Sequence, residues 1–226
     1  MDPLDDKANF RGKAPKERSP LLLTDPAVIN RPHICGFFSS DDDEFRAVIP
    51  FILEGLEKGE KAFHTVDPAR RAAHLRQLVS AGIDVTAAQE SGQLEVHDWT
   101  EMHLRDGLFD MSRTLAGWEQ IGKRAKQNGF PLIRFVTLME WALEDRPGVG
   151  YLLEYEARAN YLWLNQEGPF NPVICAYDLT KFRGDVVVDV MRTHPLTIIG
   201  GIIQENPFFV HPDEFLRELR ERRERG

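Results

Sequence analysis

The chain has 226 residues, of which 42% are hydrophobic and 28% are charged. These values lie near the averages of globular proteins, and they exclude a fully disordered chain, a collagen-like fibre and a low-complexity protein. The formal net charge of -8 argues against a nucleic-acid-binding surface, because such a surface needs clustered Lys and Arg to neutralise phosphates.

No apolar run approaches the roughly 18 residues that a membrane-spanning helix needs. The N-terminus carries acidic residues where a secretory signal has an apolar stretch, so export is not expected. We therefore expect a cytoplasmic protein.

Residues 1–30 contain Pro3, Pro15, Pro20 and Pro26 and no apolar period, which predicts a flexible arm. We expect the folded domain over residues 31–216. Residues 217–226 alternate Arg with Glu, as the charged end of a C-terminal helix does.

The first half of the domain alternates strands with helices. The apolar run at residues 33–38 predicts a strand, and Ser and Asp behind it favour the start of a helix that ends at Lys58-Gly59. A strand at 61–66, a helix opening at Asp67-Pro68 and closing near Gly82, and a strand at 94–99 follow.

The second half continues this alternation. The pattern predicts a helix at 108–128, a strand at 132–138, a turn at 141–144, a helix at 150–166 and a strand at 172–177. A last strand at 196–203 precedes a helix that begins at Pro212. Six strands alternating with helices indicate an α/β, three-layer sandwich around a mainly parallel sheet.

Ligands of open parallel sheets bind at the carboxyl ends of the strands, so we expect the site there. Aromatic, apolar and acidic side chains end the predicted strands. Glu140, beside Trp141, is either a carboxylate with a pKa raised by burial or a solvated loop residue. The candidate ligand-binding residues are Ser39, Ser40, Asp41, Asp67, Trp99, Met139, Glu140, Trp141 and Tyr177.

The loop behind the first strand stands where a phosphate-binding loop would lie. It has neither a glycine nor a Lys followed by Ser or Thr, and three consecutive aspartates would repel a triphosphate. The sequence also lacks the common nucleophile-elbow, zinc-protease and dinucleotide motifs. We therefore expect no catalytic residue and no cofactor.

The two cysteines, Cys35 and Cys175, lie in apolar runs and are expected to be reduced and buried. His33 and Cys35 share one face of a strand, as do Cys175 and Tyr177, so a histidine and two thiols would approach one another if these strands are neighbours. A metal site needs three or four converging ligands, and the sequence shows no paired zinc motif. We favour core packing over metal binding.

Six segments of the chain, taken in order, resemble the MEDS family, the methanogen/methylotroph DcmR-type sensory domain. They are HICGFFSSDDDEFRAVIPFILEGLEKGEKAF, AGIDVTAAQESGQLEV, IRFVTLMEWAL, LLEYEARANYL, VICAYDLTKF and MRTHPLTIIGGIIQENPFFVHPDEFL, which together cover about residues 33 to 216. The resemblance implies a RecA/KaiC-like sandwich without a functional Walker A loop. It also implies signal input from small hydrocarbon-type compounds.

The chain departs from the family pattern in two respects. Relatives carry a glycine, an acidic residue and a methionine behind one strand, where this chain has Thr137-Leu138-Met139, with Glu140 one residue beyond. Family members also often join this domain to a helix-turn-helix or a kinase-type module, and none fits in the tail. We therefore expect the output to pass through a protein partner or a homo-oligomer.

The leading hypothesis is a non-catalytic cytoplasmic sensor that binds a small, largely apolar ligand and signals through a protein partner, without direct contact with nucleic acid or membrane. Two alternatives stay open. One is a KaiC-like nucleotide-binding enzyme in which Asp67 or Glu140 activates water. The other is a structural adaptor that binds no ligand.

Overall fold

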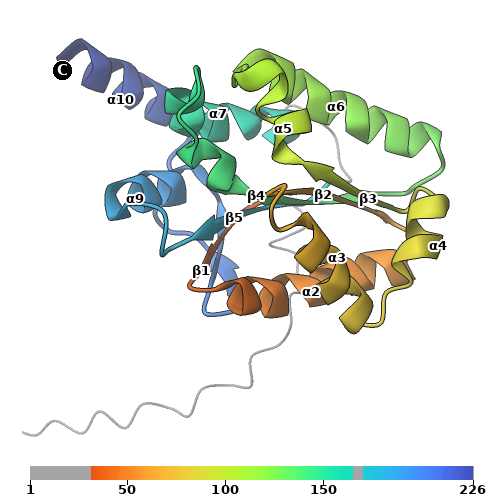
Figure 1. The fold of residues 1–226 in the computed structure, drawn as a ribbon. Coiled ribbons are helices and arrows are strands. Elements are labelled where there is room, and N and C mark those ends of the chain that lie inside the picture. Colours follow the sequence, from red (N-terminus) through yellow and green to blue (C-terminus); the bar gives the residue numbers. More distant parts are fainter. Residues whose placement is uncertain (1–31, 165–169, 226) are drawn as a thin grey trace, which may run out of the picture.

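The computed structural model describes residues 32–164 and 170–225. The predicted arm, residues 1–30, lies outside the described residues. The chain folds as the expected α/β sandwich of three layers, with a central sheet between two layers of helices (Figure 1).

In the described part of the chain, the sheet has seven strands in the order β3-β2-β4-β5-β1-β6-β7. All neighbouring pairs are parallel except β6 and β7, which are antiparallel. The strands are β1 (His33–Phe38), β2 (Lys61–Val66), β3 (Leu94–Asp98), β4 (Ile133–Leu138), β5 (Val173–Asp178), β6 (Leu196–Ile199) and β7 (Ile202–Glu205).

The prediction of one strand over residues 196–203 was wrong. The segment is a hairpin of β6 and β7, in which Ile199 pairs with Ile202 across the turn. Gly200 and Gly201 form that turn with φ values of 57° and 73°. Positive φ at both central residues is the geometry of the two-residue hairpin turn whose twist matches the flanking strands, and glycine adopts it without strain.

The helices largely follow the predicted ones, with three differences. Asp67-Pro68 open a turn rather than a helix, so α3 begins at Arg71, and the short α4 follows it. The predicted helix at 150–166 is broken at Asn160 into α7 and α8, and neither α5, which begins at Trp99 of the predicted strand 94–99, nor α9 was predicted. The helices are α2 (Asp41–Glu57), α3 (Arg71–Ser80), α4 (Val85–Glu90), α5 (Trp99–Met102), α6 (Met111–Gln127), α7 (Leu152–Ala159), α8 (Tyr161–Leu164), α9 (Gly184–Thr193) and α10 (Pro212–Arg225), with short 3-10 helices η1 (Arg105–Gly107), η2 (Met139–Leu143) and η3 (Val149–Tyr151).

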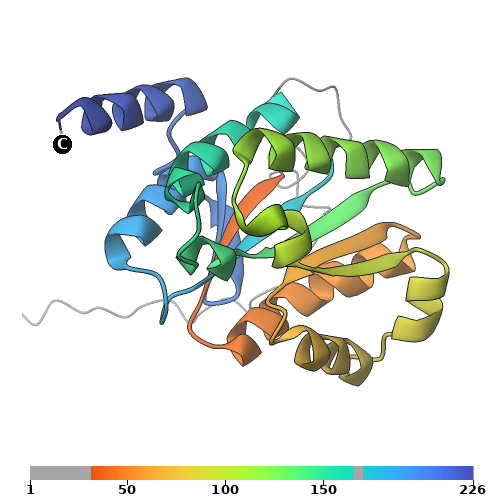
Figure 2. The ribbon, with the colours of Figure 1, turned by 45° about the horizontal axis from the view of Figure 1, so that its top comes forward.

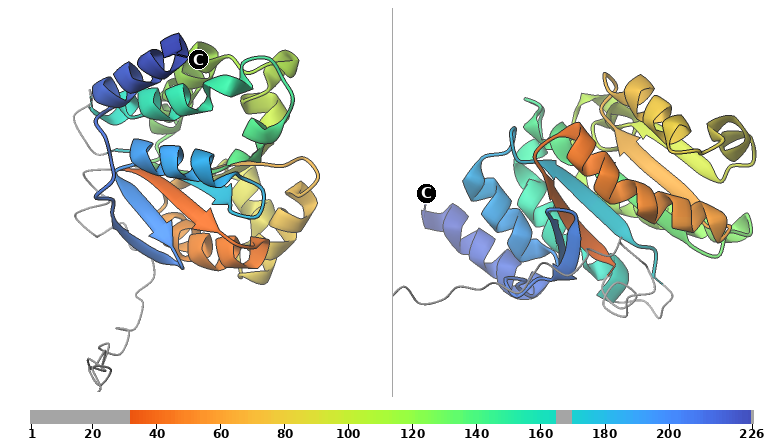
Figure 3. Two further views of the ribbon diagram at one scale, coloured as in Figure 1. Left: turned by 90° about the vertical axis from the view of Figure 1, so that its left-hand side faces the viewer. Right: turned by 90° about the horizontal axis from the view of Figure 1, so that it is seen from below.

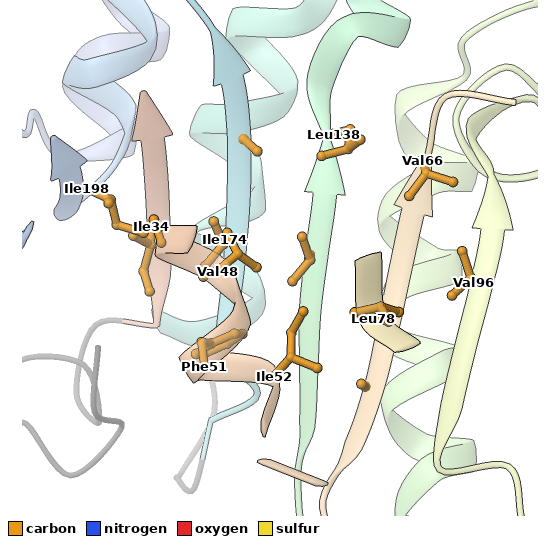
Figure 4. Packing of buried hydrophobic residues seen from close by; sticks show 14 of the residues in the cluster. Ile34, Val48, Phe51, Ile52, Val66, Leu78, Val96, Leu138, Ile174 and Ile198 are labelled. Carbon is orange, nitrogen blue, oxygen red and sulfur yellow. The ribbon is translucent and has the colours of Figure 1, made fainter. Parts of the chain in front are cut away.

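The two faces of the sheet bury separate apolar cores. Strand side chains alternate between faces, so Ile34 packs into one core while Cys35 packs into the other. In the first core, α2 and α3 cover the sheet, and Figure 4 shows Val48 of α2 close to Ile174 of β5. Helices α6, α7 and α9 cover the opposite face (Figures 1 and 3).

The parallel strands bring their carboxyl ends to one edge of the sheet, from which α2, α5, η2 and the turn behind β5 continue (Figure 2). At the start of α2, the Ser40 side chain accepts a hydrogen bond from the Asp43 backbone N–H at 3.2 Å. This N-cap satisfies one of the free N–H groups that a helix start leaves, as the sequence predicted. None of the described helices combines the length and the apolar character that a bilayer crossing requires.

Candidate functional site

Ion pairs occupy the carboxyl edge of the sheet. The Arg70 guanidinium, in the turn behind β2, lies 2.9 Å from an Asp41 carboxylate oxygen, 3.3 Å from Glu44 and 3.0 Å from Glu140. The Lys181 ammonium lies 3.2 Å from Glu140 and 3.0 Å from Asp178. Two cations therefore hold acidic groups from α2, η2 and β5 together across the edge.

Glu44 is the perturbed acid of this edge. The pKa of its carboxyl group is raised from 4.5 to about 7, mainly by burial; Arg70 opposes this shift, and the charge of Glu140 adds to it. Glu44 is 8% exposed. Its charge is therefore the one most sensitive to pH near neutrality in this network.

The predicted site residues divide between loop caps and core. Ser39 and Ser40 bond with Asp43 at the start of α2, and Asp67 accepts the backbone N–H of Ala69 at 2.8 Å. Trp99, Met139 and Trp141 are buried in the core beneath α6 and α7. The prediction of a ligand site formed by these residues stays a prediction.

Trp141 shows this core packing most clearly. It is 0% exposed, and its ring stacks on His103 at 4.6 Å between centroids and lies 4.5 Å from Phe109. Glu140, next to it, is buried and paired with Arg70 and Lys181, so it is not a solvated loop residue.

A cavity of about 600 Å³ lies on the opposite side of this core, between α6, α7 and the strands β4, β5 and β1. Its walls are mainly apolar and aromatic, while charged groups of α6 lie at one side. The predicted site residues are not among those that line it. The lining residues are His33, Trp118, Glu119, Gly122, Lys123, Ala125, Lys126, Phe130, Pro131, Leu132, Ile133, Phe135, Thr137, Tyr155, Glu156, Ala159, Leu162, Asn171, Val173 and Cys175.

A group of buried polar side chains borders this cavity, and three of its four members line it. We call His33, Glu156, Cys175 and His194 the buried cluster; each offers one ligand atom, and these four atoms all lie within 4.8 Å of one another. Tyr177, a predicted site residue, donates its hydroxyl hydrogen to Oε1 of Glu156. Two members come from neighbouring strands. Cys175 of β5 lies opposite Cys35 of β1, and His33 is two residues before Cys35, on the same face of β1.

Burial dominates the protonation of the buried cluster. It lowers the pKa of His33 and of His194 to about 3 each, and it raises the pKa of Glu156 and of the Cys175 thiol. The two imidazoles are therefore neutral at physiological pH. Within the described residues, Nε2 of His194 has no hydrogen-bond partner.

Two members of the buried cluster were not proposed from the sequence. Glu156 lies one helical turn beyond Leu152 and before Asn160, on the buried face of α7, so an acidic residue at an apolar position was a signal that could have identified it. His194 follows the end of α9 and precedes β6, where no periodic pattern marks it. Glu154, two residues before Glu156 and on another face of α7, pairs instead with Arg158, whereas Glu156 is fully buried.

Residues 32–195 of the chain match the family described as "MEthanogen/methylotroph, DcmR Sensory domain". The chain belongs to the MEDS family. The resemblance found in the six sequence segments is thus confirmed, and with it a sensory and regulatory class of protein. The transcriptional repressor DcmR of Methylorubrum extorquens (strain DSM 6343 / CIP 106787 / DM4) is 27% identical over 164 residues, which are 72% of this chain.

This MEDS chain spans 57% of the length of that repressor. The comparison gives no support to the expectation that the chain avoids nucleic acid, because the relative is a transcriptional repressor; that expectation stays a prediction. Among solved structures, a KaiC-like protein from Pyrococcus horikoshii OT3 superposes with a TM-score of 0.53 at 15% identity, over 74% of this chain and 71% of that one. The likeness confirms the KaiC-like fold.

Proposed function

We propose that this MEDS chain is a cytoplasmic sensory domain that binds a small, largely apolar molecule in the cavity and signals through a protein partner. The observation that carries the proposal is the cavity itself. Its volume of about 600 Å³ lies within the range of about 300 to 1,000 Å³ that is usual for small-molecule sites. An interior that serves only as a scaffold is normally packed without such a space.

The lining favours a ligand with an apolar body and one polar group. Trp118, Phe135 and Tyr155 supply aromatic walls, and Val173 and Ala159 supply small apolar ones. Three members of the buried cluster, His33, Glu156 and Cys175, supply buried polar groups to the lining. Such a site orients a ligand through a few polar contacts, while the apolar contacts provide most of the affinity.

Helix α7 offers a route for the signal. It lines the cavity through Tyr155 and Glu156, and its Ala157 packs against Phe215 and Leu216 of α10. Arg223 of α10 also lies 2.9 Å from Glu154. A ligand that shifts α7 would therefore move α10, whose charged outer face is the surface that we assign to a protein partner.

The alternative of a nucleotide-binding enzyme meets two obstacles at the carboxyl edge. The turn behind β1 contains Ser39 and Ser40 without glycine or lysine. Arg70 is paired with three carboxylates of the protein, so it is not available to a phosphate. We expect calorimetry with magnesium-ATP to show no binding in the low micromolar range, about -8 kcal/mol.

The experiment compares thermal unfolding with and without a panel of small alcohols, ketones and halogenated hydrocarbons. A ligand at 100 times its dissociation constant adds about 2.7 kcal/mol, which raises the melting temperature by roughly 5 to 10 °C for a domain of this size. Ala125→Trp fills the cavity from α6 and is expected to abolish the rise. Ala116→Trp, on the exposed side of the same helix, is the matched control and keeps it.

Equal stabilisation of the wild type and Ala125→Trp would place the ligand elsewhere and would favour the carboxyl edge. Stabilisation by magnesium-ATP, with turnover, would support the enzyme. If no compound of the panel changes the melting temperature and a partner is captured equally by the wild type and Ala125→Trp, the adaptor is the better description.

A further inference from the structure

The buried cluster joins four different elements of the fold. His33 begins β1, Cys175 lies in β5, Glu156 lies in α7 and His194 follows α9. All four side chains are buried, with exposed fractions of 5% or less. The fold thus buries four polar side chains at one point. Such burial costs free energy unless each polar group has a hydrogen-bond or metal partner.

Four of the separations between the ligand atoms are close to those of a metal coordination sphere, and all of them are within 4.8 Å. Nε2 of His33 lies 3.2 Å from Oε2 of Glu156 and 3.6 Å from Sγ of Cys175. Oε2 of Glu156 lies 3.5 Å from Nε2 of His194 and 3.9 Å from Sγ of Cys175. A tetrahedral zinc ion, with bonds of about 2.0 to 2.3 Å, holds its ligand atoms roughly 3.3 to 3.6 Å apart.

Outer hydrogen bonds fix both imidazoles in the orientation that metal binding requires. The Asn160 amide nitrogen donates to the backbone carbonyls of Glu156, Ala157 and Thr193, so its Oδ1 faces His33 and accepts from Nδ1 at 3.2 Å. Nδ1 of His194 donates to the Val190 carbonyl at 2.9 Å. Each ring therefore presents the lone pair of Nε2 to the cluster, an arrangement typical of metal-binding histidines.

Nε2 of His194 is buried and, among the residues that the structure describes, has no hydrogen-bond partner. Two Nε2 lone pairs and Oε2 of Glu156 converge, while Tyr177 already donates to the other carboxylate oxygen. A proton on Glu156 serves one imidazole, and the Cys175 thiol is a weak donor. A divalent cation accepts all of these lone pairs at once.

We propose that the buried cluster binds one zinc ion. Two imidazoles, one carboxylate and one thiolate are ligands that zinc accepts, and the thiolate disfavours magnesium and calcium. On binding, the thiol proton of Cys175 and any proton of Glu156 leave to solvent. The two negative charges then balance the ion, which makes the site neutral in a buried environment.

The site stands independently of the proposed small-molecule function. Three of its members, His33, Glu156 and Cys175, also line the cavity, which gives the ion a path from solvent. A ligand in the cavity would therefore lie next to the metal.

The test uses the full chain, freed of metal with a chelator and titrated with zinc and, separately, with cobalt(II) as a spectroscopic probe. We expect one zinc ion per chain by elemental analysis. We also expect tetrahedral d–d bands and a near-ultraviolet thiolate-to-cobalt band. The chain has two cysteines, so Cys175→Ser and Cys35→Ser assign the thiolate.

Cys35 is the matched control because it is fully buried and pairs with Cys175 in the sheet, while its thiol contacts the Leu196 carbonyl at 3.6 Å. Cys35→Ser is expected to keep the thiolate band and Cys175→Ser to lose it. His194→Gln is expected to weaken zinc binding at least about 100-fold, since even outer-sphere changes weaken metal binding by 10- to 100-fold.

A wild-type chain that binds neither metal stoichiometrically, or binds cobalt without a thiolate band, would overturn the proposal. So would binding that Cys175→Ser and His194→Gln leave unchanged. The wild-type titration decides the matter even if both variants fail to fold. A zinc site with no response to the compound panel would leave the metal proposal intact and count against the sensor alone.

Discussion

Replacing Glu44 with glutamine tests the charge network at the carboxyl edge of the sheet. Burial raises the pKa of Glu44 from 4.5 to about 7, so the folded protein holds this proton more tightly than the unfolded chain does. The contribution of Glu44 to stability is therefore fully present below about pH 4.5 and is lost as the pH rises to 7. At about 1.4 kcal/mol per pKa unit, ionisation of Glu44 costs about 3 kcal/mol above pH 7.

Glu44→Gln keeps the shape of the protonated carboxyl group and cannot ionise. We expect its free energy of unfolding, relative to the wild type, to rise by about 3 kcal/mol between pH 4 and pH 8, measured by urea denaturation. Asp42→Asn, on the exposed side of the same helical turn, controls for the general effect of charge removal. A difference between wild type and Glu44→Gln that stays constant across this range, or that falls as the pH rises, would refute the assignment of Glu44 as the perturbed acid.

Two further predictions concern packing, and both are measured by urea denaturation. In Gly55→Ala, the added Cβ would lie 2.5 Å from Cδ and Nε of Arg134, which Glu54 and Glu60 hold in place, so we expect a loss of about 1 to 3 kcal/mol. Gly117→Ala, with no atom within 4 Å of the new Cβ, should instead gain about 0.5 to 1 kcal/mol, and equal effects of the two would contradict the packing argument. Trp141→Ala removes a ring that is 0% exposed, and we expect a loss of about 3 to 5 kcal/mol; near wild-type stability would return Trp141 to the candidate ligand contacts.

The sequence predicted the elements whose signals are local. Strands β1 and β2 are short apolar runs between polar turns, and the start of α2 carries its own cap in Ser40. The hairpin of β6 and β7 was missed because the isoleucines on both sides of Gly200 and Gly201 were interpreted as one apolar strand. Helix α9 was missed because Val186, Val187 and Val188 favour strands, whereas packing of its buried face determines the helix.

The site was less accessible to sequence reasoning. Spacing along β1 and β5 did indicate that His33 and the two cysteines would approach one another if the strands were neighbours, and they are neighbours. Glu156 and His194 join them through the packing of α7 and α9, which no local pattern encodes. A cavity is an absence of atoms among distant elements, so it too appears only once the fold is assembled.

The contrast between edge and face bears on where this MEDS chain receives its signal. At the carboxyl edge, Arg70 and Lys181 pair with the acids around them, so a ligand there would first have to break ion pairs within the protein. Beneath α6 and α7 the converse holds, because a cavity is already open there. In the proposed function, a molecule that enters that cavity would not have to break an ion pair of the carboxyl edge, and it would press on α7, which packs directly against α10. We therefore propose that signal input occurs on the face of the sheet, where binding would change the packing of a helix rather than the shape of a loop.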